Sequence, residues 1–327
     1  MSTSMTMRSL ILSIVVVTAL ACSTALADQT PTIARIGVLT PVGRVSAEAN
    51  LRQGLSELGY VEGRNLTIEW RRYPQSSDAT RSAAADLVQS RVDLIVAFGT
   101  PAARAALSAT STIPVVFVSA DPIGGGLATS LAHPDANATG ISTQGTDLMA
   151  KRLELLQQAM PGARRVVLLV NPDHPLYAAV MRETQTAVRA LRIHVDTLNA
   201  GNAEQLDAAL NRIRRGAADA LIVSSDYFFV VNKAKIADAI RRAKLPTIVP
   251  NRDYLGEGPL MSYGPSIGGA EHRAAAYVDK ILKGGKPGEL PIEQIAKFEL
   301  IIDLRAAREL GLKVPQELVL RADEVIQ

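Results

Sequence analysis

The sequence has very little of several residue types that mark particular protein classes. Among 327 residues it contains one cysteine, Cys22, and only 4% of its residues are aromatic. Disulfides within the chain are therefore excluded, because each needs two cysteines. The four histidines are far apart and lack the spacing of metal ligands (His133, His174, His194, His272). We expect a fold stabilised by its hydrophobic core, with no metal site and no cofactor.

Long blocks of charge of one sign are also absent. The chain carries 35 basic and 32 acidic residues, and the signs are interspersed, as in Arg81, Asp86, Arg91 and Asp93. The net charge of +3 is a small excess and predicts no basic face. No helix-turn-helix, zinc-finger or RNA-binding motif is found, so we expect no nucleic-acid partner. The hydrophobic content of 47% excludes a largely disordered chain.

The N-terminal residues 1–27 have the pattern of a signal peptide. Arg8 is the only charge before Asp28, and the apolar run 10–21 is shorter than the roughly 20 residues of a membrane span. Ala25-Leu26-Ala27 is a small-x-small cleavage signal. We therefore predict a periplasmic protein cleaved after Ala27. Removing 27 of 327 residues leaves 300, enough for two α/β lobes.

Cys22 leaves a second possibility for the N-terminus. Ala19-Leu20-Ala21 before it resembles a lipoprotein box, but alanine stands where leucine is usual. Cleavage after Ala27 would discard Cys22. A lipoprotein anchored at Cys22 and an uncleaved membrane anchor remain as alternatives.

Short apolar runs alternate with amphipathic helical patterns along the rest of the chain. The run 166–170 (VVLLV) is apolar throughout, which is typical of a parallel strand covered on both faces. The predicted strands are 33–39, 66–70, 94–98, 115–118, 165–170, 194–198, 220–223, 247–249, 260–262 and 300–302. The predicted helices are 46–58, 79–89, 101–107, 149–158, 177–191, 203–214, 232–243, 268–282 and 304–310. This alternation predicts an α/β fold of two doubly wound parallel-sheet lobes, with a ligand beyond the carboxyl ends of the strands.

Several segments, in order along the chain, resemble those of one receptor family. The stretch 53–65 (QGLSELGYVEGRN) resembles a motif of the ABC transporter substrate-binding family that includes tryptophan- and tyrosine-type receptors. Other similar segments are 111–117, 121–124, 151–156 (KRLELL), 261–265 (MSYGP), 277–284 and 321–326. One departure is the glycine run 124–126, where the family usually has a bulkier residue between glycines.

The resemblance implies a periplasmic-binding-protein type I-like fold with a three-crossing hinge. We assign residues 28–140 and 261–289 to the first lobe, and 141–260 and 290–327 to the second. It also implies a small-molecule ligand, an ABC permease and its ATPase as partners. The ligand is expected to resemble an amino acid, and the aromatic kind is preferred through the resemblance alone. A monomer suffices for this role.

Candidate ligand-binding residues in the first lobe follow three predicted strands. Gly99 permits a tight turn after the third strand, and free amides of the helix that starts there, including that of Ala102, can bind a carboxylate together with Thr100. Alternatively, Thr100 only caps the helix. The remaining candidates are Thr40, Ser119 and Asp121. Asp121 would pair with a ligand ammonium, unless it only caps the turn before Pro122.

Polar and aromatic residues follow the strands of the second lobe in the same way. Asp226 is a second candidate partner for an ammonium group. Tyr177, Phe228 and Tyr263 could stack on an aromatic ligand, although core packing would explain each of them as well. The second-lobe and hinge candidates are Asn171, Tyr177, Ser225, Asp226, Asn251 and Tyr263.

The sequence carries no motif of an enzyme. It lacks a Gly-x-Ser-x-Gly elbow and a phosphate-binding loop, and the predicted mature chain has no cysteine nucleophile. We therefore expect a binding protein and not an enzyme. A ligand-sensing receptor for a membrane kinase and a secreted α/β enzyme are kept as alternatives. A transcription regulator is disfavoured by the export signal and the lack of a DNA-binding headpiece.

Overall fold

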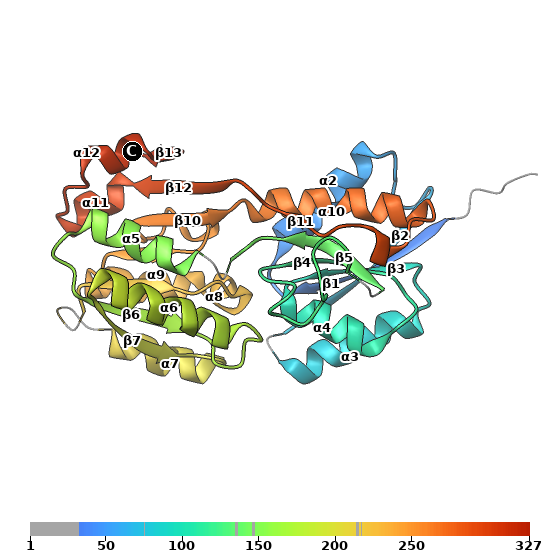
Figure 1. Cartoon of the computed structure of the whole chain (residues 1–327), viewed down its shortest axis with the longest axis horizontal. Helices are drawn as coiled ribbons and strands as arrows, with labels where there is room; N and C mark the ends of the chain where they lie inside the picture. The colour runs from blue at the N-terminus through green and yellow to red at the C-terminus, as the bar shows by residue number, and fades with distance from the viewer. Residues whose placement is uncertain (1–32, 75, 135–136, 146–147, 214–215, 217) are drawn as a thin grey trace, which may run out of the picture.

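The computed structural model describes residues 33–327, except residues 75, 135–136, 146–147, 214–215 and 217. The predicted signal peptide, the cleavage site after Ala27 and the alternative anchor at Cys22 lie outside the described residues. The described chain forms two α/β lobes, which Figure 1 shows side by side. The predicted fold class is confirmed.

The first lobe is built on a parallel six-stranded sheet. Its strands, in spatial order, are β11 (Glu293–Gln294), β5 (Ala138–Ser142), β4 (Val115–Ser119), β3 (Leu94–Phe98), β1 (Ala34–Pro41) and β2 (Leu66–Tyr73). Helices α2 (Val45–Glu57) and α10 (Ile267–Leu282) pack together on one face, and α3 (Ser77–Gln89) and α4 (Thr100–Ala109) on the other.

The second lobe contains a seven-stranded sheet. Its order is β13 (Glu324–Ile326), β12 (Phe298–Asp303), β10 (Met261–Pro265), β9 (Thr247–Val249), β8 (Ala220–Val223), β6 (Arg165–Val170) and β7 (His194–Asn199). Its helices are α5 (Met149–Ala159), α6 (Tyr177–Leu191), α7 (Ala203–Arg212), α8 (Tyr227–Val231), α9 (Lys233–Ala243), α11 (Leu304–Leu310) and α12 (Gln316–Leu320). A short helical turn, η1 (Arg252–Tyr254), follows β9.

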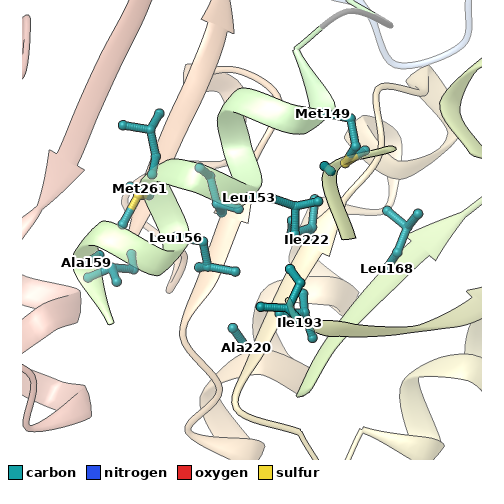
Figure 2. Packing of buried hydrophobic residues seen from close by; sticks show 14 of the residues in the cluster. Met149, Leu153, Leu156, Ala159, Leu168, Ile193, Ala220, Ile222 and Met261 are labelled. Carbon is teal, nitrogen blue, oxygen red and sulfur yellow. The ribbon is translucent and has the colours of Figure 1, made fainter. Parts of the chain in front are cut away.

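The apolar run of β6 shows why a strand without alternation fits this sheet. Leu168 and Val170 pack into the core beneath α5 and α6, part of which Figure 2 shows, whereas Leu169 packs into the core on the opposite face. Each face of the strand is thus buried under helices, so both sets of alternating side chains are apolar. The first-lobe sheet likewise has a core on each face.

The chain passes between the lobes after β5, after β10 and after β11, slightly later than the predicted boundaries. β10 pairs with β9 and β12 in the second sheet, although residues 261–265 were expected in the first lobe. β11 pairs with β5 in the first sheet, although residues 293–294 were expected in the second. Hydrogen bonds between crossings join them: Ile295 N donates to Ser142 O at 2.9 Å, and Gln144 Nε2 donates to Ile295 O at 2.7 Å.

One part of the second sheet departs from the parallel arrangement expected for the whole lobe. β12 runs antiparallel to β10, and β13 is parallel to β12. The cause is the connectivity: β10 leaves the lobe at the hinge and β12 enters at the hinge, so the two neighbours run in opposite directions. The other strand pairs of this sheet are parallel, and their carboxyl ends face the interlobe region.

Candidate functional site

A cavity lies between the lobes at the carboxyl ends of the strands. The empty space there is about 710 Å³, and part of it is open to solvent. Its walls are mostly apolar, with polar groups from both lobes. The lining includes Tyr73, Gly99, Thr100 and Ser119 of the first lobe, Ser225, Asp226, Tyr227 and Asn251 of the second, and Thr143, Pro265 and Ile267 at the crossings.

The first-lobe wall is formed by the junction of β3 and α4. Gly99 is the N-cap of α4, with a positive φ of 97° that favours glycine. The first-turn amides of Thr100 and Ala102 have no intrahelical acceptor, and Pro101 has no N–H. The hydroxyls of Thr100 and Ser119 lie 2.8 Å apart and form a buried hydrogen bond. This corner offers amide donors and the positive end of a helix dipole to an anionic group.

The second-lobe wall carries a carboxylate at the start of α8. Asp226 accepts hydrogen bonds from the Phe228 amide at 2.8 Å and from Asn171 Nδ2 at 2.7 Å. The Asn171 side chain is fixed in turn, because its Oδ1 accepts the Asp173 amide at 2.9 Å. Asp226 is only 9% exposed and lines the cavity. Asp226 is therefore a fixed carboxylate that can accept hydrogen bonds from a cationic group of a ligand.

Two tyrosines add aromatic surface to the cavity. Tyr73, at the end of β2, donates its hydroxyl to Phe98 O at 3.0 Å. Burial raises the pKa of Tyr73 and of Tyr227 well above the ordinary value, so both phenols stay neutral at physiological pH. A Cβ on Gly99 would lie 2.9 Å from Tyr227 Cε2, so the second-lobe ring packs directly against the first-lobe backbone. Both rings present flat apolar surface next to the polar corner described above.

Residues 35–326 match the family described as ABC transporter substrate binding protein. This match covers nearly the whole described chain. The chain belongs to the ABC transporter substrate-binding protein family.

Several known proteins are similar to this substrate-binding protein. A tyrosine-binding protein of Clostridioides difficile is 24% identical over 82% of this chain and 77% of its own length. A conserved domain protein from Vibrio cholerae has a TM-score of 0.84 and is 26% identical, covering 90% of this chain and 99% of its own. An ABC domain from Streptococcus pneumoniae in complex with L-Trp has a TM-score of 0.82 at 23% identity and the same coverage. Members of the family are extracytoplasmic solute-binding proteins that serve ABC transporters.

The structure brings half of the sequence-predicted site residues to the cavity of this substrate-binding protein. They come from strand ends of both lobes: Gly99, Thr100, Ser119, Ser225, Asp226 and Asn251. Asn171 lies just behind, bonded to Asp226, and lines an adjoining outer groove. The alternative role of Thr100 as a helix cap is not seen, since Gly99 occupies the cap position and no side chain caps it.

The other predicted residues lie elsewhere. Ala102 is fully buried among the α4 core residues and can contribute only its amide. The Asp121 carboxylate accepts the Gly124 amide at 2.8 Å and caps that turn. Thr40 is fully buried, and its hydroxyl has no hydrogen-bond partner among the described residues. Tyr177 and Tyr263 pack against the core of the second lobe, the latter 6.2 Å from the Phe298 ring.

Sequence reasoning missed the two cavity tyrosines. Tyr73 was missed because β2 continues past Trp70, where the predicted strand ends. Tyr227 directly follows Asp226. Extending the set of candidates after that strand by one residue would have included it. His174 was not among the predicted ligand-binding residues, but it lines the cavity as well as the outer groove, and its Nδ1 accepts the Leu176 amide at 3.2 Å.

A buried arginine supports the cavity from behind. Arg152 of α5 donates to the carbonyls of Tyr263 at 2.9 Å and Pro250 at 3.5 Å. Pro250 lines the cavity, and Tyr263 precedes the lining residue Pro265 by two positions. Arg152 thereby fixes the backbone of β10 and of the segment after β9.

Metal and membrane features were sought within the same described ranges. There, no group of three or more His, Cys, Asp or Glu side chains is arranged to hold a metal ion. Nor does any helix in that part of the chain have the length and apolar character to cross a membrane.

Proposed function

We propose that this protein is the periplasmic receptor of an ABC importer and binds a zwitterionic amino acid, with an aromatic side chain preferred, between its lobes. It would act as a monomer that delivers ligand to a permease driven by an ATPase. It would catalyse no reaction and bind no nucleic acid. Export through the predicted signal peptide belongs to the same proposal.

The observation that carries the proposal is the pairing of opposite charge preferences across one cavity. The start of α4 in the first lobe favours a carboxylate, and Asp226 in the second favours an ammonium group. An amino acid has both groups, so it would join the two lobes. Tyr73 and Tyr227 supply aromatic surface for its side chain. The tyrosine-binding relative and the L-Trp complex support the aromatic preference.

The test is a thermal-shift screen of protein unfolded and refolded to remove bound solute. L-Tyrosine, L-tryptophan and L-phenylalanine are compared with L-alanine and succinate. A ligand at about 100 times its Kd adds roughly 2.7 kcal/mol of stability, which raises Tm by several degrees. A response to aromatic amino acids and not to succinate supports the proposal.

Asp226→Asn is the informative variant, because asparagine remains a good helix N-cap while losing the charge. Loss of a charged hydrogen bond to the ligand should weaken binding roughly 10- to 100-fold. Asp121→Asn is the matched control, since that carboxylate caps a turn outside the cavity. Equal affinities of both variants, or no response to any amino acid, would contradict the proposal.

A further inference from the structure

Arg44 is a buried charge that lies outside the cavity and contacts both lobes. Within the first lobe its Nε and Nη2 donate to Glu271 Oε1 at 3.0 and 2.9 Å. Asn50 Nδ2 donates to Glu271 Oε2 at 2.9 Å. The Arg44 side chain is 4% exposed and that of Glu271 fully buried. The first lobe therefore neutralises and orients this arginine by itself.

The second lobe approaches the same guanidinium with a carboxylate and an aromatic ring. Arg44 Nη1 donates to Asp253 Oδ2, and its guanidinium carbon lies 4.9 Å from the centre of the Tyr227 ring. Asp253 is fixed within its own lobe, because its amide donates to Asn251 Oδ1 at 3.0 Å and its carbonyl accepts from Lys233 Nζ at 2.8 Å. Asp253 is thus held in place to meet Arg44.

Tyr227 connects this contact with the ligand cavity. Its ring lines the cavity and packs against the backbone of Gly99, where even a Cβ would come within 2.9 Å. The ring is therefore held between two first-lobe elements, Gly99 and Arg44. The Tyr227 ring can contact these two elements only while the lobes are together.

We propose that Arg44, Tyr227 and Asp253 form an interlobe latch that holds the cleft closed and sets the position of the Tyr227 ring. Arg44 is a positioning residue, which acts on a ligand through Tyr227. The latch can release without leaving a bare buried charge, because Glu271 stays paired with Arg44 in the first lobe. The Asp253 side chain is 33% exposed and becomes hydrated on opening. The inference rests on the proposed function only in that closure accompanies ligand capture.

The test measures lobe separation in the refolded, ligand-free protein. Nitroxide labels are placed at Ser108→Cys on α4 and Ala203→Cys on α7, both exposed, in a chain with Cys22→Ser so that no other cysteine reacts. Pulsed electron–electron double resonance then gives the distribution of distances between the two labels. Asp253→Asn should raise the ratio of open to closed populations at least threefold. Added salt should shift the unsubstituted protein in the same direction, because Asp253 is partly exposed.

Arg72→Gln is the control for breaking an arginine–carboxylate pair that lies within one lobe. Arg72 also pairs with a carboxylate, donating to both oxygens of Glu48 at 2.7 Å, and lies 6.0 Å from the Trp70 ring. All three residues belong to the first lobe, so the distribution should not change. Asp253→Glu should restore most of the closed population.

The result for Asp253→Asn decides the matter, because this variant keeps the buried Arg44–Glu271 pair and with it the fold. An unchanged distribution in Asp253→Asn, or an equal shift in Arg72→Gln, would overturn the latch. Failure of L-tyrosine to bind any of these proteins would count against the proposed function alone, since the distances are measured without ligand.

Discussion

Arg44 and Arg152 are both buried, but the groups around them differ in charge. Arg44 meets the carboxylates of Glu271 and Asp253, whereas Arg152 donates to the carbonyls of Tyr263 and Pro250. Burial lowers the pKa of Arg44, but Tyr227, Glu271 and Asp253 together raise it above its ordinary value. Burial lowers the pKa of Arg152 to about 10.

The difference corresponds to two tasks. Arg44 is paired with a carboxylate from each lobe, so it links parts that move relative to each other. When the lobes separate, its ion pair with Glu271 stays intact. Arg152 is bonded to backbone carbonyls within one lobe and fixes the path of the chain there. Its hydrogen bonds do not have to break when the lobes separate. Breaking each contact should therefore affect different properties.

Arg44→Gln is the substitution with the largest expected effect on stability. It leaves the Glu271 carboxylate buried without its cation, and removal of one member of a buried ion pair costs about 3–5 kcal/mol. Urea unfolding measures the change. Adding Glu271→Gln should recover most of the loss, since no unpaired charge then remains. The ion-pair explanation fails if the double variant is no more stable than Arg44→Gln.

Arg152→Lys should have a smaller effect. Lysine keeps the charge but lacks the planar fork of donors with which arginine reaches two carbonyls. One buried carbonyl is then left without a hydrogen bond, which should lower the free energy of unfolding by about 1–3 kcal/mol. Lys151→Arg, on the exposed side of the same helix, is the control and should stay within about 0.5 kcal/mol of the parent. Equal unfolding free energies for the two variants would contradict the role given to Arg152.

The strand and helix pattern could be predicted from sequence because it is local. Apolar runs such as that of β6 and the Gly99–Pro101 helix start are set by neighbouring residues. Strand ends then located Thr100, Ser119 and Asp226 at the cavity, since parallel strands bring their carboxyl ends to one edge.

Contacts between residues far apart in the chain could not be predicted in this way. Arg44 and Glu271 are 227 residues apart in the chain, and no local pattern relates them. Arg152 lies in a segment that resembles the family, but its bonds to Pro250 and Tyr263 depend on the packing of α5 on the sheet. Tyr263 and Tyr177 could equally well have faced a ligand, and only the tertiary arrangement packs them against the core.

A third arginine contact, an exposed arginine–carboxylate pair, is expected to contribute less to stability than the two buried ones. Arg165 Nη2 donates to Asp219 Oδ1 at 3.2 Å, with the two side chains 55% and 31% exposed. Asp219 also accepts the backbone amides of Arg165 and Arg164, each at 2.8 Å. These amide bonds, first that of Arg165 and then that of Arg164, hold the pKa of Asp219 below its ordinary value of 3.8. Arg165→Gln should therefore change stability by less than about 1 kcal/mol, because exposed ion pairs contribute little.

Asp219→Asn should instead lose about 1 kcal/mol at neutral pH, because the amides of Arg164 and Arg165 then bond to a neutral acceptor. A carboxyl group with a lowered pKa in the folded state stabilises the protein fully above 3.8 and loses this effect as pH falls through the folded value. The stability difference between parent and Asp219→Asn should thus shrink as the pH falls below the ordinary value of 3.8. Urea unfolding across this range measures it, with Asp207→Asn at the exposed Lys235 pair as control. A difference that stays constant as the pH falls well below 3.8 would contradict a contribution from the charge of Asp219.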